Sequence, residues 1–213
     1  MVNAVLSSCF LQVKRMDIRE AIIQEAEAVI LRTGFYDLHY KEISERTGVL
    51  PSEIHYLFPS KDDLGCTVIQ RARISFKEWT KHIDHTIPDP KEKMDAYFAS
   101  YRATLLAGDK ICLGGILGAE LNTLPTTMQT ELRFYYMERQ KWLEQVLYDG
   151  LYGGNFMFKE AVEEKALFIL ASIQGGLQIA RINEDNDIFF TICRQLYNQL
   201  LYNQRADAVM LKS

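Results

Sequence analysis

The sequence is notable first for what it lacks. Its four cysteines, Cys9, Cys66, Cys112 and Cys193, are far apart and form no C-x-x-C pair, which excludes a zinc site and a disulfide framework. No apolar run approaches the roughly 18 residues of a membrane span. We therefore expect a cytoplasmic protein that has no contact with the membrane.

The sequence also has no excess of positive charge. It contains 24 basic and 28 acidic side chains, which give a formal net charge of −4. A chain with this balance has no overall attraction to nucleic acid. Any contact with DNA must come from a local arrangement of residues.

Motifs of enzyme chemistry are missing as well. The sequence has no glycine-rich phosphate loop, no H-E-x-x-H, no G-x-S-x-G and no plausible pair of catalytic carboxylates. Its four histidines are scattered and suggest no metal cluster. We expect no cofactor, no metal and no catalysis, and a helical enzyme is the least favoured alternative.

What is present is helical periodicity along most of the chain, with no run that alternates as a strand would. Gly34 and Gly48 each follow a helical segment, Pro51 suits a first turn, and Ser60 with Asp63 has the form of a capping box. A long helix should run from there to about residue 85. Further helices are expected over about 91–107, 112–121, 126–151, 159–182 and 187–203. The predicted fold is all-α with about nine helices.

Two short helices joined at Gly48 and preceded by a packing helix describe a helix-turn-helix. One helix of such a motif fits the major groove of B-DNA while the other lies across the backbone. A small helical bundle of any function can contain the same turn, so geometry alone leaves the function open.

Residue identities favour the DNA-binding interpretation. Gly34-Phe35, Lys41 to Ser44, Thr47 to Val49 and the run IHYLFPSKDDL over 54–64 together resemble the N-terminal domain of TetR-family transcriptional repressors (TetR/AcrR type). The run CLGGILGAEL over 112–121 more loosely resembles one branch of that family, in which Cys-Leu opens helix 6. The resemblance implies three parts: an N-terminal extension over 1–16 that is possibly disordered, a DNA-binding domain over 17–64, and a helical ligand-binding and dimerisation domain over 65–213.

The resemblance also implies roles for individual residues. The motif would cover about 40–59, and its recognition helix would start at Leu50 and end at Leu57. Lys61 matches a lysine that usually meets a phosphate, which suits the positive end of a helix. Lys41 and Thr47 are further candidates for backbone contacts. The residues expected to face DNA are Pro51, Ser52, Glu53, His55 and Tyr56.

Two departures from the family pattern affect the DNA-binding part. Leu38-His39 stands where hydroxyl residues are usual, so the second helix loses its side-chain cap. The motif is also slightly acidic, and Lys14, Arg15 and Arg19 with Lys61 would have to neutralise most phosphates. Glu53 either accepts a hydrogen bond from a cytosine amino group or stays solvated or caps its own helix.

In the C-terminal part, the last two helices are where TetR-like proteins dimerise. A dimer would read a palindromic operator with half-sites one helical turn apart. Gly175-Gly176 would allow close approach of two backbones, although these helices could also serve the chain's own core. The residues expected at the dimer contact are Leu177, Phe189, Ile192, Leu196 and Leu200.

The central helices carry a mixed set of aromatic and polar residues, as a small-molecule site requires. The competing interpretation of each member is core packing. For Cys112 the alternatives are a reactive thiol at a helix start and a buried small hydrophobe. The candidate ligand residues are Phe76, Trp79, His82, Tyr97, Tyr101, Cys112, Glu120, Phe134, Trp142, Gln174 and Gln178.

Together these features predict a sequence-specific DNA-binding transcriptional regulator. We expect a homodimeric repressor that an unknown small-molecule effector releases from double-stranded DNA at a palindromic operator. A ligand-independent regulator of the same fold, acting on DNA or on a protein partner, is the alternative.

Overall fold

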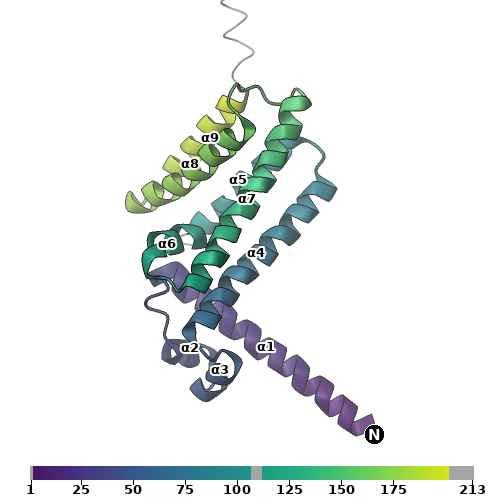
Figure 1. Cartoon of the computed structure of the whole chain (residues 1–213), viewed down its shortest axis with the longest axis vertical. Coiled ribbons are helices and arrows are strands. Elements are labelled where there is room, and N and C mark those ends of the chain that lie inside the picture. Colours follow the sequence, from purple (N-terminus) through teal and green to yellow (C-terminus); the bar gives the residue numbers. More distant parts are fainter. Residues whose placement is uncertain (1, 107–111, 202–213) are drawn as a thin grey trace, which may run out of the picture. The chain divides into compact units, whose positions relative to one another are not determined.

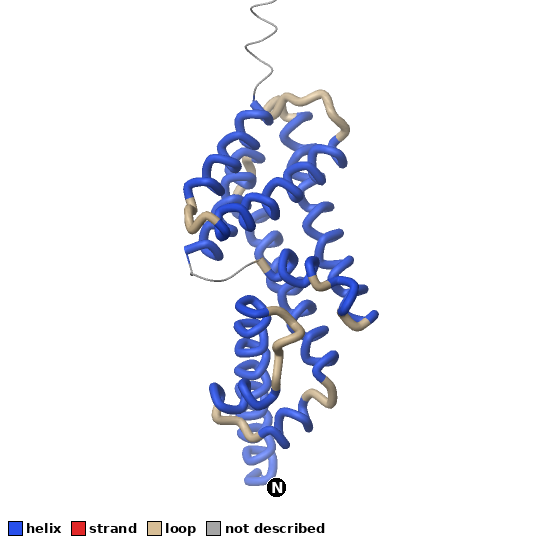
Figure 2. Tube along the Cα trace, turned by 90° about the vertical axis from the view of Figure 1, so that its left-hand side faces the viewer, coloured by secondary structure: helices blue, strands red, loops and turns tan. Residues whose placement is uncertain are grey.

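The structure is a computed structural model that describes residues 2–106 and 112–201, with side chains described from residue 17 onward except at 103, 104 and 106. Every regular element in these residues is a helix, which confirms the all-α prediction (Figure 2). The chain divides into two compact units. Unit 1 comprises residues 1–72 and 116–132, and unit 2 comprises residues 73–115 and 133–213.

The order of the helices follows the expectation closely (Figure 1). The first four are α1 (Val2–Thr33), α2 (Tyr40–Thr47), α3 (Pro51–Leu57) and α4 (Lys61–Thr86). After these come α5 (Pro90–Leu106), α6 (Leu113–Ala119), a 3-10 turn (Leu121–Thr123), α7 (Thr126–Tyr152), α8 (Val162–Ile182) and α9 (Asp187–Leu201).

The helix ends have local causes. Gly48 adopts a left-handed conformation with φ of 72° and donates its N–H to the Ser44 carbonyl, which ends α2. Pro51 occupies the first turn of α3, as expected. The Asp63 N–H donates to Ser60 Oγ at 3.1 Å and the Ser60 N–H donates to Asp63 Oδ2 at 3.2 Å, which confirms the predicted capping box.

Two helix starts differ from the expectation. α1 begins at Val2, so the segment 2–16, expected as an extension outside the first helix, is helical. α8 begins at Val162 instead of about residue 159, because the preceding segment runs along the end of α9. There the Met157 N–H donates to the Leu200 carbonyl at 2.7 Å and Phe158 is buried.

Unit 1 is built around α1, which contacts α2, and α2 in turn contacts α3. Its core comes from Ile22, Ile30, Ile43 and Ile54, none of which is exposed. The start of α7 joins this core, since Met128 is fully buried and its sulfur lies where a Cβ on Gly65 would fall. The helix-turn-helix thus has a hydrophobic core of its own.

Unit 2 contains the larger core. α8 and α9 lie side by side, as Figure 1 shows, and contribute Ile169, Ile173 and Phe189 to it. α4, α5 and α7 contribute a second group that is mainly aromatic. This aromatic group includes several of the residues that the sequence suggested for a ligand site.

Candidate DNA-binding surface and effector site

One face of the recognition helix α3 is buried against the rest of unit 1, and its other face is exposed to solvent. Ile54 is fully buried and Phe58, just after the helix, is 1% exposed. The side chains expected to face DNA all lie on the open side: Pro51, Ser52, Glu53, His55 and Tyr56 are exposed. Tyr56 is the most prominent, at 70% exposure.

Tyr40 positions this helix and was not foreseen from the sequence. Its hydroxyl donates to the Phe58 carbonyl at 2.9 Å, and its ring meets the His55 ring edge-on at 4.6 Å. Burial, followed by the nearby Asp63 and Asp62 charges, raises the pKa of Tyr40 to about 12. The hydroxyl therefore remains a donor at neutral pH and holds the end of α3.

Two residues expected at the DNA backbone make contacts within the protein. Lys61 donates from Nζ to the Tyr36 carbonyl at 2.6 Å and lies 4.7 Å from the centre of the Phe35 ring. Burial lowers the pKa of Lys61, while neighbouring carboxylates act in the opposite direction. Thr47 donates its hydroxyl to the Ile43 carbonyl at 2.7 Å. Both residues thus support the turns around α2, whereas Lys41 is exposed.

The acidity of the motif is partly compensated by α1 and α2 themselves. Arg32 and Arg46 both reach Glu42, and Arg46 also lies 3.2 Å from Glu25. Lys41 lies 3.9 Å from Glu45, at the limit of an ion pair. Arg32 belongs to α1 and lies outside the motif, so counting the charges within the motif did not reveal its contact with Glu42. The side chains of Lys14 and Arg15 lie outside the described residues.

In unit 2, five of the candidate ligand residues form one aromatic cluster. Trp142 lies 5.2 Å from Trp79 and 5.5 Å from Tyr97 between ring centres. Phe76 lies 5.9 Å from Trp79, and Tyr101 lies 5.2 Å from Tyr97. These rings come from α4, α5 and α7, so the fold brings together residues that are distant in sequence.

A polar group continues this cluster at the start of α6. Gln174 of α8 donates from Nε2 to Cys112 Sγ at 3.5 Å, and the Tyr135 hydroxyl lies 3.6 Å from the same sulfur. The Tyr97 and Tyr101 hydroxyls are 3.1 Å apart. Burial raises the pKa of Tyr101 to about 12 and raises those of Tyr97 and Tyr135 well above their usual value. These hydroxyls therefore stay protonated.

The structure places the remaining candidates elsewhere. His82 is exposed on α4, Gln178 is half-buried on α8, and Phe134 is 40% exposed beneath the Arg73 guanidinium. Glu120 belongs to unit 1, where its Oε2 accepts the Phe35 N–H at 2.8 Å. Its other oxygen lies where a Cβ on Gly34 would fall. Glu120 therefore holds the turn before α2.

Arg139 is the main cluster residue that sequence reasoning missed. It is 7% exposed, and its guanidinium lies 3.3 Å from the centre of the Tyr135 ring and 4.3 Å from that of Phe76. The available signal was its spacing, four residues after Tyr135 and three before Trp142, on the same face of α7. Arginine is rarely buried, so its residue type argued against a place in the cluster.

The arrangement of helices matches known proteins over nearly its whole length. The HTH-type transcriptional repressor DhaR of Mycobacterium sp. (strain GP1) is 26% identical over 185 residues, which cover 84% of this chain and 91% of DhaR. A TetR-family regulator from Agrobacterium tumefaciens superimposes with a TM-score of 0.84 at 26% identity, covering 88% of this chain and 99% of the regulator.

A TetR regulator from Legionella pneumophila gives a TM-score of 0.78, also at 26% identity, over 85% of this chain and 96% of its own. The chain shares the fold of TetR-family transcriptional regulators, and its sequence is similar to theirs. No protein-family model matches it.

Most of the residues expected at the dimer contact are buried within the chain itself. Leu177, Phe189, Leu196 and Leu200 are at most 5% exposed and join the core of unit 2, and Ile192 is half-buried against it. They hold α8 to α9. Of these five residues, only Ile192 keeps part of its surface for a contact with a second chain.

The outer face of α8 carries an apolar stripe instead. Its members recur at helical spacing and are all exposed: Phe168, Ala171, Gly175, Ile179 and Ile182. A Cβ on Gly175 would meet nothing within 4 Å, whereas a Cβ on Gly176 would lie 3.0 Å from Ile192. Packing within the chain therefore restricts the side chain at position 176 more than the one at position 175.

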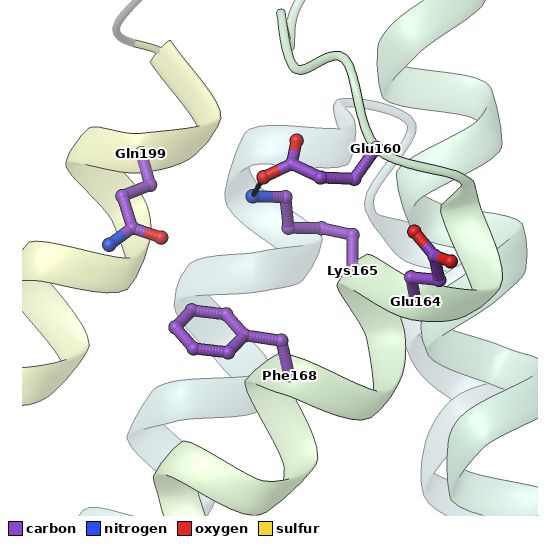
Figure 3. A pocket seen from close by; sticks show the side chains of 5 residues that line it. All are labelled: Glu160, Glu164, Lys165, Phe168 and Gln199. Carbon is purple, nitrogen blue, oxygen red and sulfur yellow. Dashed lines mark hydrogen bonds and ion pairs between the residues drawn. The ribbon is translucent and has the colours of Figure 1, made fainter.

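A small pocket of about 250 Å³ lies beside this stripe, where α8 begins and α9 ends. Figure 3 shows Lys165 reaching the Glu160 carboxylate, with Phe168 of α8 and Gln199 of α9 at the same pocket. Lys165 Nζ lies 2.8 Å from Glu160 Oε1. This ion pair lowers the pKa of Glu160 and compensates the charge of Lys165.

Within residues 2–106 and 112–201, no helix is long and apolar enough to span a bilayer. Among the residues whose side chains are described, no group of three histidine, cysteine or acidic residues could bind a metal ion.

Proposed function

We propose that the protein is a homodimeric repressor whose two α3 helices read a palindromic operator and which a small-molecule effector releases from DNA. The observation that carries the proposal is the orientation of α3. Ile54 and Phe58 anchor it while its five candidate base-contacting residues are exposed. A helix presented in this way can enter the major groove. We expect no catalytic activity, and we expect the protein to act in the cytoplasm.

The test of DNA recognition begins with selection of bound fragments from the organism's own genomic DNA. Tyr56→Ala should weaken binding to the selected operator by about tenfold or more, because a good base contact contributes about 1–3 kcal/mol. Tyr152→Ala is the matched control, since Tyr152 is 75% exposed on α7 and belongs to unit 2, whereas the motif belongs to unit 1. Equal affinities of the two variants would refute α3 as the reading helix.

The apolar stripe of α8 supports dimerisation. Phe168 lies seven residues before Gly175 and Ile182 seven residues after it. If two α8 helices cross antiparallel at Gly175, Phe168 of one chain therefore lies near Ile182 of the other. An exposed glycine inside a helix costs about 1 kcal/mol relative to alanine, so a close crossing gives a reason for its presence.

Gly175→Leu tests this crossing. We expect the variant to sediment as a monomer at concentrations where the wild type is a dimer, because the added side chain separates the two backbones. Its helix content should not fall, since leucine favours a helix more than glycine does. Arg133→Leu, a change at an exposed position of α7, is the control. A Gly175→Leu dimer as tight as the wild type would refute the crossing.

Effector release requires the ligand to bind one state of the protein better than the other. Helix α6 can carry such coupling because it directly connects Cys112 to Glu120 along the chain. Cys112, before α6, belongs to the polar part of the cluster in unit 2, and Glu120, just after α6, holds Phe35 in unit 1. A change in the cluster that shifts α6 would alter the support of the turn before α2.

A further inference from the structure

The polar part of the cluster contains a buried cation that pairs with no carboxylate of the described residues. Arg139 donates from Nη1 to the Tyr135 carbonyl at 3.0 Å and hydrogen-bonds to Tyr101. Its guanidinium also stacks against Tyr135 and Phe76. Among the residues that the structure describes, no carboxylate forms an ion pair with it. Burying a charge in this state is strongly unfavourable.

Three other sheltered cations of unit 2 are compensated. Lys165 pairs with Glu160 at 2.8 Å, and Lys93 pairs with Asp84 at the same distance. Arg73 pairs with Glu138 at 2.6 Å. Arg139 is the exception among these four, so its charge calls for a partner that the described part of the chain does not supply.

The surroundings of Arg139 define what that partner would be. Tyr97 and Tyr101 stay protonated and offer hydroxyl donors, and the rings of Phe76 and Trp142 offer flat apolar walls. Arginine binds a carboxylate through two parallel hydrogen bonds, and aromatic walls favour a planar ligand. Asp84 accepts from the Trp142 indole N–H at 3.2 Å, but Lys93 already pairs with this carboxylate at 2.8 Å, so its charge is compensated.

One acceptor in the cluster is also unmatched. Gln174 Oε1 is buried without a hydrogen-bond partner, while the Nε2 of the same amide donates to Cys112. A buried carbonyl oxygen of this kind is satisfied by a donor such as a hydroxyl group. A ligand that carries a hydroxyl in addition to a carboxylate would meet both needs.

We infer that the effector is a small aromatic carboxylate. Its carboxylate pairs with Arg139 and accepts from the tyrosine hydroxyls, its ring packs against the rings of Phe76 and Trp142, and a ring hydroxyl donates to Gln174. This inference rests on the proposed function, since it names the class of molecule that would release the repressor.

The test measures binding to the full chain in the absence of DNA. Benzoate and 4-hydroxybenzoate are titrated by calorimetry, with benzamide and benzyl alcohol as neutral analogues. We expect both acids to bind, the hydroxylated one more tightly. The neutral analogues should bind at least about 30-fold more weakly, because they leave the buried charge unpaired.

Arg139→Met tests the residue, with Arg133→Met on the exposed side of α7 as the matched control. Arg139→Met should lose acid binding and melt no lower than the wild type without ligand, because the substitution removes an uncompensated buried charge. Arg133→Met should bind as the wild type does. If Arg139→Met does not fold, the affinities of the wild type for benzoate and for benzamide are compared instead. Tighter binding of benzoate then supports the inference.

The inference is overturned if neither benzoate nor 4-hydroxybenzoate binds the wild type. It is equally overturned if benzoate and benzamide bind with the same affinity. It is also overturned if Arg139→Met retains acid binding. Failure of the proposed function would look different: the wild type would bind no genomic fragment, or no small molecule would release it. A neutral compound that releases both the wild type and Arg139→Met from DNA would preserve the function and refute the carboxylate.

Discussion

Replacing His39 with serine should stabilise the DNA-binding motif. His39 is the N-cap residue of α2, with an extended backbone (φ −127°, ψ 133°) that suits a cap, but its side chain forms no capping hydrogen bond. This confirms the absent cap expected from the sequence. The first N–H groups of a helix have no partner within it, so α2 begins without side-chain support.

The magnitude follows from comparison with Ser60, the N-cap residue of α4. Ser60 Oγ accepts the Asp63 N–H at 3.1 Å, and a serine at position 39 can make the corresponding bond to the first turn of α2. A serine cap contributes about 1 kcal/mol. His39 is exposed, so the substitution removes little buried surface. The expected gain of about 1 kcal/mol corresponds to about 2–4 °C in melting temperature for a chain of this length.

Urea unfolding monitored by circular dichroism at fixed protein concentration measures this gain, because the stability of a dimer depends on concentration. Ser60→Ala is the opposite control and should lose about 1 kcal/mol by removing an existing cap. If His39→Ser leaves the midpoint unchanged or lowers it while Ser60→Ala lowers it as expected, the capping argument for α2 is refuted.

Three further outcomes are expected. Because Lys165 lowers the pKa of Glu160 below its ordinary value of 4.5, the pair stabilises the native state above that pH and the contribution is lost as pH falls through the lowered value. Acid titration of stability should therefore show a smaller loss in Lys165→Met, and equal losses would refute the coupling. Glu120→Ala should destabilise the protein by about 1–3 kcal/mol, because the Phe35 N–H loses its charged acceptor, and unchanged urea unfolding would contradict this. If Cys112 senses electrophiles, Cys112→Ser should keep operator binding but no longer be released by an alkylating quinone in a mobility-shift assay, and release as in the wild type would exclude this cysteine.

Much of the local structure could be predicted from the sequence. The ends of α2, α3 and α4 depend on Gly48, Pro51 and Ser60, whose effects act within a few residues along the chain. The exposure of the recognition helix follows from the helical spacing of Ile54 and Phe58, since the opposite face must then point outward. Rules of this short range require no knowledge of the tertiary fold.

The candidate sites depend more on contacts between distant segments. Sequence patterns identified an aromatic and polar group, but they assigned Glu120 to the ligand site and did not single out Arg139. They also selected Leu177 and Phe189 for the dimer contact, whereas both are buried between α8 and α9.

What the sequence determined by itself is therefore the set of helices, their ends and the apolar face of each. Only the tertiary structure decided which element each face meets. The physical reason is that periodicity identifies an apolar or charged side but carries no information about its partner. The same stripe can cover the chain's own core or a second chain, and a buried arginine can be recognised only when its neighbours in space are known.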